Sequence, residues 1–219
     1  MAVHFSQRRY MTTLNNIRSK VIPTWCPGCQ DYVVFAGLQA AILSLQVSLE
    51  DVVIVYDIGC IGNMADFFKA YGIHSLHGRC IPTALGVKLA NPKLHVIAVG
   101  GDGGIYGEGL NHLLSAARLD ADITVVVANN HLYSLTTGQT SPTTPQGSKT
   151  KSTPQGAPAI ALNPIPLIKT VNPNVMAEHV DCHQPVEVNQ IIAKAIIHQG
   201  FSLLDLDQVC VTFGKKLTA

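Results

Sequence analysis

Apolar and β-branched residues gather in four short runs along the chain, separated by polar segments and by stretches of helical periodicity. The runs cover residues 52–57, 94–100, 123–129 and 201–207. Each is almost continuously apolar, which is typical of strands that are buried on both faces of a parallel sheet. We therefore predict four central, parallel strands.

Helical spacing of apolar residues appears between these runs. Residues 84–90, 107–119 and 186–199 each predict a helix, and the last ends before Gly200 as a capped helix does. The motif Trp-Cys-Pro-Gly-Cys occupies residues 25–29. The segment 26–41, which contains its two cysteines, continues as an apolar helix. Strands that alternate with helices predict an α/β fold with a doubly wound, mainly parallel sheet.

One long segment, residues 136–173, is rich in Thr, Pro, Gly and Ser and has no clear periodicity. A loop of this length inside a compact domain is usually functional. We expect it to cover a cofactor or to contact a partner; the alternative is a disordered linker.

The composition excludes several classes of protein. Of the 219 residues 47% are hydrophobic and 13% charged, and the net charge is +1. Without a basic face, nucleic-acid binding is not expected. Residues 1–20 lack the apolar run of a signal peptide, and no stretch approaches a membrane span. We expect a cytoplasmic protein whose cysteines are reduced.

A glycine-rich turn follows the predicted strand 94–100. Backbone N–H groups of Gly101, Gly103 and Gly104 can approach phosphate oxygens there, at the start of a helix. Asp102 would repel a phosphate unless Mg²⁺ lies between them, and Asn130 offers another hard oxygen ligand at the end of the next strand. Taken alone, the turn is also compatible with an ordinary strand–helix connection.

This segment resembles the thiamine diphosphate motif, which opens with Gly-Asp-Gly and closes with Asn-Asn. The resemblance implies that Asp102, Asn130 and the backbone carbonyl of Leu132 coordinate Mg²⁺. It also implies that Gly101 to Gly104 face the diphosphate.

Cysteines mark a second candidate site. Cys26-Pro27-Gly28-Cys29 by itself is compatible with half a zinc site, a redox pair or half an iron–sulfur site. Cys60 and Cys210 follow predicted strands and are expected at the same sheet edge as the glycine-rich turn. Four converging thiolates favour a [4Fe–4S] cluster. The other two, Cys80 and Cys182, are interpreted as buried free thiols.

A series of motifs extends the resemblance over nearly the whole chain, from Trp25 to Phe213. They are Trp25 to Cys29, Ile58-Gly59-Cys60, His77-Gly78-Arg79, Lys88 to Pro92, the thiamine motif, Leu135 to Thr144 and Cys210 to Phe213. In this order they resemble the β subunit of a 2-oxoacid:ferredoxin oxidoreductase. The resemblance implies an N-terminal extension over residues 1–24, a thiamine diphosphate-binding domain with an iron–sulfur site over residues 25–219, and cluster ligation by Cys26, Cys29, Cys60 and Cys210.

The family chemistry is the oxidative decarboxylation of a 2-oxoacid to acyl-CoA and CO₂. Thiamine diphosphate stabilises the carbanion, the cluster passes single electrons to ferredoxin, and coenzyme A takes the acyl group. The same site can run in reverse. His77 and Arg79 are candidate catalytic residues; the alternative is that either only hydrogen-bonds the local turn.

Thiamine enzymes also need a carboxylate that activates the aminopyrimidine. None of Glu50, Glu108, Glu178 and Glu187 fits this role in the sequence. The glutamate is therefore expected from a partner α subunit, with γ or δ subunits as further candidates, and the β chain alone is expected to be inactive.

Three features depart from the family pattern. The chain ends soon after Cys210, Gln30 stands where Gly is common, and Thr137 stands where Lys is common, which leaves the preference for an acidic substrate open. Two other functions compete with the main interpretation. A non-oxidative thiamine decarboxylase or synthase domain would not need the four cysteines, and an inactive scaffold subunit would be expected to have lost metal ligands.

Overall fold

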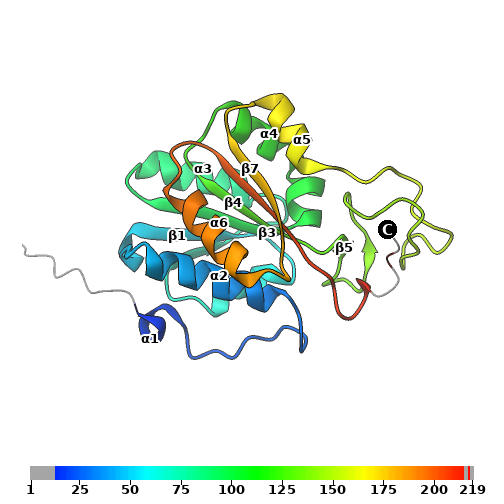
Figure 1. The fold of residues 1–219 in the computed structure, drawn as a ribbon, viewed down its shortest axis with the longest axis horizontal. Coiled ribbons are helices and arrows are strands. Elements are labelled where there is room, and N and C mark those ends of the chain that lie inside the picture. The colour runs from blue at the N-terminus through cyan, green and yellow to red at the C-terminus, as the bar shows by residue number, and fades with distance from the viewer. Residues whose placement is uncertain (1–12, 215–216, 218–219) are drawn as a thin grey trace, which may run out of the picture.

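Six parallel strands form the central sheet of the computed structural model, which describes residues 13–214 and residue 217. The strands follow the order β2-β1-β3-β4-β8-β7 across the sheet (Figure 1). Their bounds are Val52–Tyr56 (β1), Tyr71–His74 (β2), His95–Gly101 (β3), Thr124–Asn129 (β4), Met176–Asp181 (β7) and Ser202–Asp207 (β8). The predicted doubly wound parallel sheet is confirmed, including its four central strands.

The strand order reverses between β1 and β3. The chain leaves β1 toward β2 on one side and then returns to β3 on the other side. In open α/β sheets, ligands bind beyond the carboxyl ends of the strands at such a switch point. Asp57 follows β1 and Asp102 follows β3, so both carboxylates lie at this position.

The register of the sheet aligns the ends of three strands. Gly101 at the end of β3 pairs with Ala128, and Asn129 at the end of β4 pairs with Asp207 at the end of β8. The residues that follow these strands therefore share one edge, as the sequence predicts for Asn130 and its neighbours.

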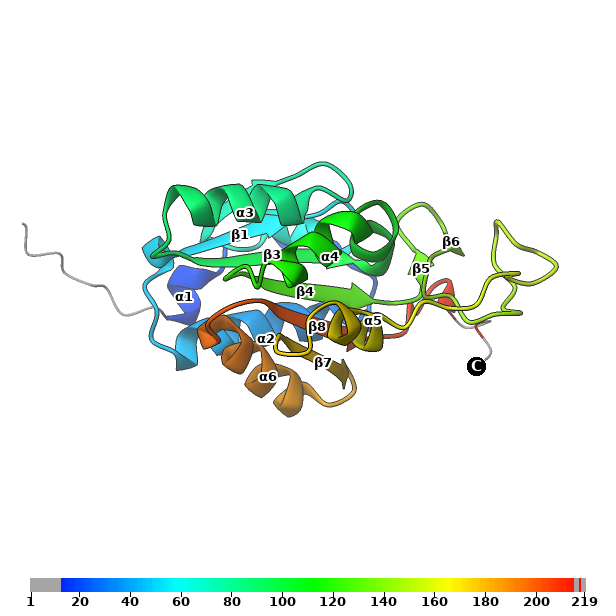
Figure 2. The same cartoon turned by 90° about the horizontal axis from the view of Figure 1, so that it is seen from above.

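Helices cover both faces of the sheet (Figure 2). One face carries α2 (Asp31–Ser44) and α6 (Pro185–Ile197); the other carries α3 (Cys80–Ala90), α4 (Leu110–Arg118) and α5 (Pro164–Val171). Successive side chains of a strand point to opposite faces. Ile54 of β1 therefore belongs to the core under α2 and α6, whereas its neighbours Val53 and Val55 belong to the core under α3 to α5.

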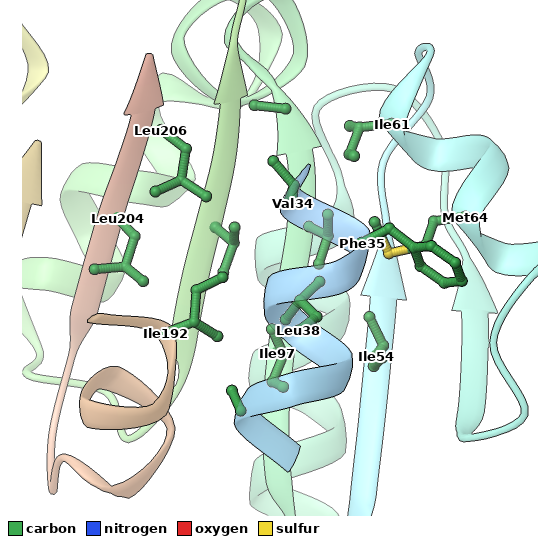
Figure 3. Close-up of a cluster of buried hydrophobic side chains, with 14 of the residues drawn as sticks. Val34, Phe35, Leu38, Ile54, Ile61, Met64, Ile97, Ile192, Leu204 and Leu206 are labelled. Atoms are coloured by element: carbon green, nitrogen blue, oxygen red, sulfur yellow. The ribbon is translucent and has the colours of Figure 1, made fainter. Parts of the chain in front are cut away.

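The core under α2 fixes the helix that begins next to the first cysteines. Val34 and Leu38 of α2 point toward Ile54 and Ile97 on the sheet (Figure 3), and all four side chains are fully buried. Burying an aliphatic side chain of this size contributes about 1.5–3 kcal/mol. This packing holds the start of α2, and with it Cys29, at the carboxyl edge of the sheet.

Two strands of the central sheet, β2 and β7, and one helix packed on it, α5, were not predicted. The edge strand β2 is exposed along its whole length, and β7 at the opposite edge is exposed at three of six positions. Edge strands have no continuous apolar run because they are only partly covered. The helix α5 lies inside the segment 136–173, which the sequence predicts as a loop, and it begins at Pro164, a residue that suits the first turn of a helix.

Helix boundaries also differ from the predictions. The helix predicted over 107–119 is split, because Gly103–Glu108 forms a wide π-helical turn and α4 starts only at Leu110. The helix predicted over 84–90 begins earlier, at Cys80. The short remaining elements are α1 (Leu14–Ile17), η1 (Leu49–Asp51), η2 (Ile61–Asp66), β5 (Leu132–Tyr133) and β6 (Gln139–Thr140).

Of the predicted extension over residues 1–24, residues 1–12 lie outside the described residues. In the part that follows, Ile17 is fully buried and the Arg18 Nε donates a hydrogen bond to Gln39 Oε1 at 2.8 Å. Within the described part of the chain, every helix is too short or too polar to cross a membrane.

Candidate functional site

Two neighbouring cavities open at the carboxyl edge of the sheet. One has a volume of about 120 Å³ and is lined by the glycine-rich turn, Asn130 and His77. The other has a volume of about 260 Å³ and is lined by the four predicted cluster cysteines. We call them the glycine cavity and the cysteine cavity. They share six lining residues: Asp31, Cys60, Asn130, Ser134, Leu135 and Gln208.

Asp102 begins the wall of the glycine cavity. Its carboxylate is 1% exposed, and Oδ2 accepts a hydrogen bond from the Thr143 hydroxyl at 2.9 Å. Burial raises the pKa of Asp102 to about 6, although hydrogen bonds from Ser141 and Thr143 oppose the rise. A buried carboxylate whose partners are mainly neutral hydroxyls is short of positive charge.

The same Thr143 hydroxyl lies 2.8 Å from Asn129 Oδ1. A hydroxyl carries one proton, so it can donate to only one of the two oxygens at a time. A cation on Asp102 would relieve this shortage of positive charge. The donor set at this position therefore fits a hard divalent ion such as Mg²⁺.

Asn130 and Leu132 also line the glycine cavity. Asn130 Oδ1 accepts hydrogen bonds from the Leu132 backbone N–H at 3.1 Å and the Ser134 hydroxyl at 2.9 Å, which fix its orientation. Between them His131 adopts φ +61° in the left-handed region, where the chain turns back. The structure thus brings the three predicted Mg²⁺ ligands to one cavity.

The side chain of His131 fixes this turn through contacts of both ring nitrogens. Its Nε2 donates to Asp207 Oδ1 at 2.6 Å, and its Nδ1 lies 3.0 Å from the Thr143 carbonyl. Burial lowers the pKa of His131, but the Asp207 carboxylate, the Asp102 charge and the Thr143 carbonyl together outweigh it, so the net pKa lies above its usual value.

The glycines of the turn are required by close approach. A Cβ atom on Gly103 would lie 2.3 Å from the Tyr133 ring, and one on Gly104 would lie 2.5 Å from Asp57 Oδ1. Both distances are far inside van der Waals contact. At these positions the backbone therefore forms a smooth wall that only glycine allows.

His77 lines the glycine cavity and is held between two carboxylates. Its Nδ1 donates to Asp57 Oδ1 at 2.9 Å, and its Nε2 lies 3.4 Å from Glu108 Oε2. Asp57 is fully buried and also accepts the Gly78 N–H at 3.0 Å. Asp57 was not predicted as a site residue, although a carboxylate directly after a buried strand was a usable signal.

Arg79, the other predicted catalytic residue, does not line either cavity. Its Nη1 donates to the carbonyls of Gly78 and Glu108, both at 3.2 Å. Glu108 also accepts a hydrogen bond from the Tyr133 hydroxyl at 3.2 Å. Arg79 therefore ties two turns together at the rim, and its catalytic role stays a prediction.

The four predicted cluster cysteines line the cysteine cavity together. Sulfur atoms there receive weak hydrogen bonds: the Thr212 hydroxyl donates to Cys26 at 3.4 Å, and the Phe213 N–H donates to Cys210 at 3.4 Å. Such donors tune iron–sulfur sites. Burial, followed by the nearby Asp31 charge, raises the pKa of both Cys29 and Cys60 to about 12.

All four cysteine thiols line one cavity. No group of three or more His, Cys, Asp or Glu side chains in the described residues is spaced to hold a single metal ion. Four cysteines on one cavity are the usual donor set of a [4Fe–4S] cluster, and cluster ligation by them stays a prediction. Cys80 and Cys182 are buried free thiols, as interpreted from the sequence.

The wall between the cavities carries a polar pair. Gln208 Nε2 donates to Asp31 Oδ1 at 2.9 Å, and burial raises the pKa of Asp31 to about 6. Gln208 Oε1 is buried without a hydrogen-bond donor among the described residues. Gln30, which departs from the family pattern, accepts the Val209 N–H with its side-chain oxygen at 2.7 Å and so anchors the turn before Cys210.

Fold and site together are those of a thiamine diphosphate-binding domain. Residues 57–206 match the family described as thiamine pyrophosphate enzyme, C-terminal TPP binding domain. This range includes the glycine-rich turn, His77, Asn130 and Leu132, which line the glycine cavity.

Curated relatives narrow the class. The chain is 42% identical over 192 residues to the 2-oxoacid:ferredoxin oxidoreductase subunit beta of Saccharolobus solfataricus, covering 87% of this chain and 63% of that subunit. It is 35% identical over 197 residues to the 2-oxoglutarate synthase subunit KorB of Archaeoglobus fulgidus, covering 90% of this chain and 73% of that one. The chain thus spans less than two thirds of the first relative.

A solved structure of an enzyme of this kind is also similar to this chain. The 2-oxoglutarate:ferredoxin oxidoreductase from Magnetococcus marinus, with 2-oxoglutarate, coenzyme A and succinyl-CoA bound, superposes with a TM-score of 0.90 at 32% identity, covering 94% of this chain and 70% of that one. This chain belongs to the thiamine pyrophosphate enzymes and, within them, to the β subunits of the 2-oxoacid:ferredoxin oxidoreductases.

Proposed function

We propose that this chain is the thiamine diphosphate-binding β subunit of an enzyme that converts a 2-oxoacid and coenzyme A to acyl-CoA and CO₂, with ferredoxin as electron acceptor. The observation that carries the proposal is the shared wall of the two cavities, to which Asn130 and Cys60 both contribute. A non-oxidative thiamine enzyme would have no use for four cysteines beside the cofactor.

In this proposal Asp102, Asn130 and the Leu132 carbonyl hold Mg²⁺, and the backbone from Gly101 to Gly104 faces the diphosphate. Thiamine diphosphate supplies an electron sink for the carbanion that decarboxylation leaves. The buried position of Asp102 favours a bound cation, because the cation removes an uncompensated charge.

Cys26, Cys29, Cys60 and Cys210 hold the [4Fe–4S] cluster. The high pKa of Cys29 and Cys60 keeps their protons in place until iron displaces them, so assembly of the cluster releases protons. Assembly of the cluster needs reduced thiols. Because cysteines are kept reduced in the cytoplasm, we place the protein there.

His77 is the candidate catalytic residue on the cavity wall. Because Asp57 accepts the proton on Nδ1, the ring is oriented with Nε2 toward Glu108 at the rim of the cavity. The glutamate that activates the aminopyrimidine comes from a partner α subunit. In support of this, Glu108 is already bound to Tyr133 and lies beside His77.

The test is anaerobic purification of the chain together with its partner subunit. Iron, acid-labile sulfide and thiamine diphosphate are measured, and turnover is followed as reduction of ferredoxin that requires a 2-oxoacid and coenzyme A. Thiamine without iron would support a non-oxidative enzyme, zinc would overturn the cluster, and both cofactors without turnover would indicate a scaffold subunit.

Two variants separate the sites. Cys210→Ala is expected to lose iron and keep thiamine diphosphate, whereas Asp102→Asn is expected to lose thiamine diphosphate and keep iron. Cys80→Ala, which removes a buried thiol outside both cavities, is the control and is expected to keep both.

A further inference from the structure

The turn between β5 and β6 forms part of the rim of both cavities. Thr136 lines the glycine cavity, and the next residue, Thr137, lines the cysteine cavity. Thr137 adopts φ +80°, a region that β-branched residues rarely enter. Strain of this kind persists only where the surroundings hold the residue in place, and it concentrates at functional sites.

Lys151 holds this turn from the long loop. Its ammonium donates a hydrogen bond to Thr137 Oγ1 at 2.5 Å, and its backbone N–H donates to the Gly138 carbonyl at 3.2 Å. Lys151 itself is exposed. The side chain therefore brings a positive charge to the rim, and an ammonium with three protons can donate to another acceptor besides Thr137.

A cluster of hydroxyl groups keeps the loop in this position. Thr140 Oγ1 lies 2.7 Å from the hydroxyls of both Thr150 and Thr153, and these two lie 2.9 Å from each other. The Ser152 hydroxyl accepts the Thr140 N–H at 2.9 Å. Lys151 lies between Thr150 and Ser152 in this segment, so the cluster holds its backbone beside the turn between β5 and β6.

The charge of the cavities gives the ammonium its importance. Among the described residues, the lining of the two cavities contains the acidic side chains Asp31 and Asp102 but no Lys or Arg. A negatively charged substrate that enters between such walls needs a cation at their edge. Within the part of the chain that the structure describes, Lys151 is the one lysine whose ammonium is bonded to a lining residue.

We propose that the Lys151 ammonium, presented on Thr137, binds an anionic group of an incoming substrate. The group is either the second carboxylate of a dicarboxylic 2-oxoacid or the 3′-phosphate of coenzyme A, since both offer charged oxygen acceptors. This inference rests on the proposed function, which supplies the substrates.

The test uses the assembled enzyme and the variant Lys151→Gln, with Lys149→Gln as the control. Lys149 lies on the same loop, is exposed, and makes no side-chain hydrogen bond to the described residues. Steady-state kcat and KM are compared for 2-oxoglutarate against 2-oxobutanoate, and for coenzyme A against its analogue without the 3′-phosphate.

Lys151→Gln is expected to raise one KM roughly tenfold, as loss of one charge-assisted hydrogen bond does at a partly exposed site, with kcat little changed. A rise for 2-oxoglutarate but not for 2-oxobutanoate identifies the carboxylate, and a rise for coenzyme A but not for its analogue identifies the phosphate. Lys151→Arg is expected to restore most of the affinity, and Lys149→Gln to leave all values unchanged.

Unchanged KM values in Lys151→Gln overturn the inference, as does an equal rise within both pairs of compounds or an equal effect of Lys149→Gln. A wild-type enzyme that turns over none of a panel of 2-oxoacids, these two included along with pyruvate, branched-chain and aromatic 2-oxoacids, overturns the proposed function and this inference with it. If the wild type turns over its substrates and the KM values of Lys151→Gln equal those of the wild type, this inference alone is overturned.

Discussion

Replacing Asp102 with Asn is expected to stabilise the folded chain and to abolish its binding of Mg²⁺ and thiamine diphosphate. The carboxylate is 1% exposed, and its hydrogen bonds come from neutral hydroxyls such as that of Thr143. Asn has almost the same shape, and its amide oxygen can still accept the Thr143 proton. The substitution therefore removes a buried charge with little change in packing.

The magnitude follows from the pKa of this group. Asp102 rises from an ordinary pKa of 3.8 to about 6 in the folded chain because of burial, and at 1.36 kcal/mol per pKa unit this corresponds to about 3 kcal/mol. The folded state holds the proton more tightly than the unfolded state, so the wild type loses stability as pH rises from about 4 to above 6. The Asp102→Asn variant has no carboxyl group at this position, so it does not lose stability in this way as the pH rises.

Urea denaturation of the cofactor-free chain at pH 4.5 and pH 8 measures the effect. We expect Asp102→Asn to raise the free energy of unfolding by about 3 kcal/mol at pH 8 and by much less at pH 4.5. Mg²⁺ with thiamine diphosphate at about 100 times the dissociation constant should then stabilise the wild type by about 2.7 kcal/mol and the variant not at all.

Asp66→Asn is the matched control, because Asp66 is exposed and lies outside both cavities. It is expected to change the free energy of unfolding little at either pH. A gain for Asp102→Asn that is the same at pH 4.5 and pH 8 would refute the electrostatic reasoning, since a packing effect does not titrate.

Three further outcomes are expected. Gln30→Gly removes the side-chain oxygen that accepts the Val209 N–H, which loosens the turn carrying the last cysteine; iron content after anaerobic gel filtration should fall, while thiamine diphosphate is retained. Gly104→Ala places a Cβ atom 2.5 Å from Asp57 Oδ1 and should weaken thiamine diphosphate binding at least tenfold, as measured by calorimetry. Unchanged binding would contradict the proposal that the backbone from Gly101 to Gly104 faces the diphosphate. Cys80→Ala should lower the free energy of unfolding by about 1 kcal/mol through lost packing without changing either cofactor.

Local patterns were sufficient for the centre of the sheet. The four central strands are continuous apolar runs because both of their faces are covered, and this leaves a direct trace in the sequence. The edge strands β2 and β7 leave no such trace, because one side of each meets solvent and their patterns mix polar with apolar residues.

Asp57 and Thr143, which support the candidate site, were not among the predicted site residues. Asp57 and Thr143 act through partners 20 and 41 positions away in the chain, His77 and Asp102 respectively. Short motifs do not contain such distant pairs. They form only when the parallel register brings the ends of β1, β3 and β4 to one edge.

The sequence by itself determined the class of fold, the glycine-rich turn with its carboxylate, and the four cysteines, because each is a local pattern with a chemical reason. It presented Thr137 only as a departure from the family, in a position where a lysine is common. Only the tertiary structure decided that a lysine ammonium reaches this position, since the clamped loop brings Lys151 back over 14 residues to Thr137. Charge at the rim depends on how the loop folds, and no local pattern records it.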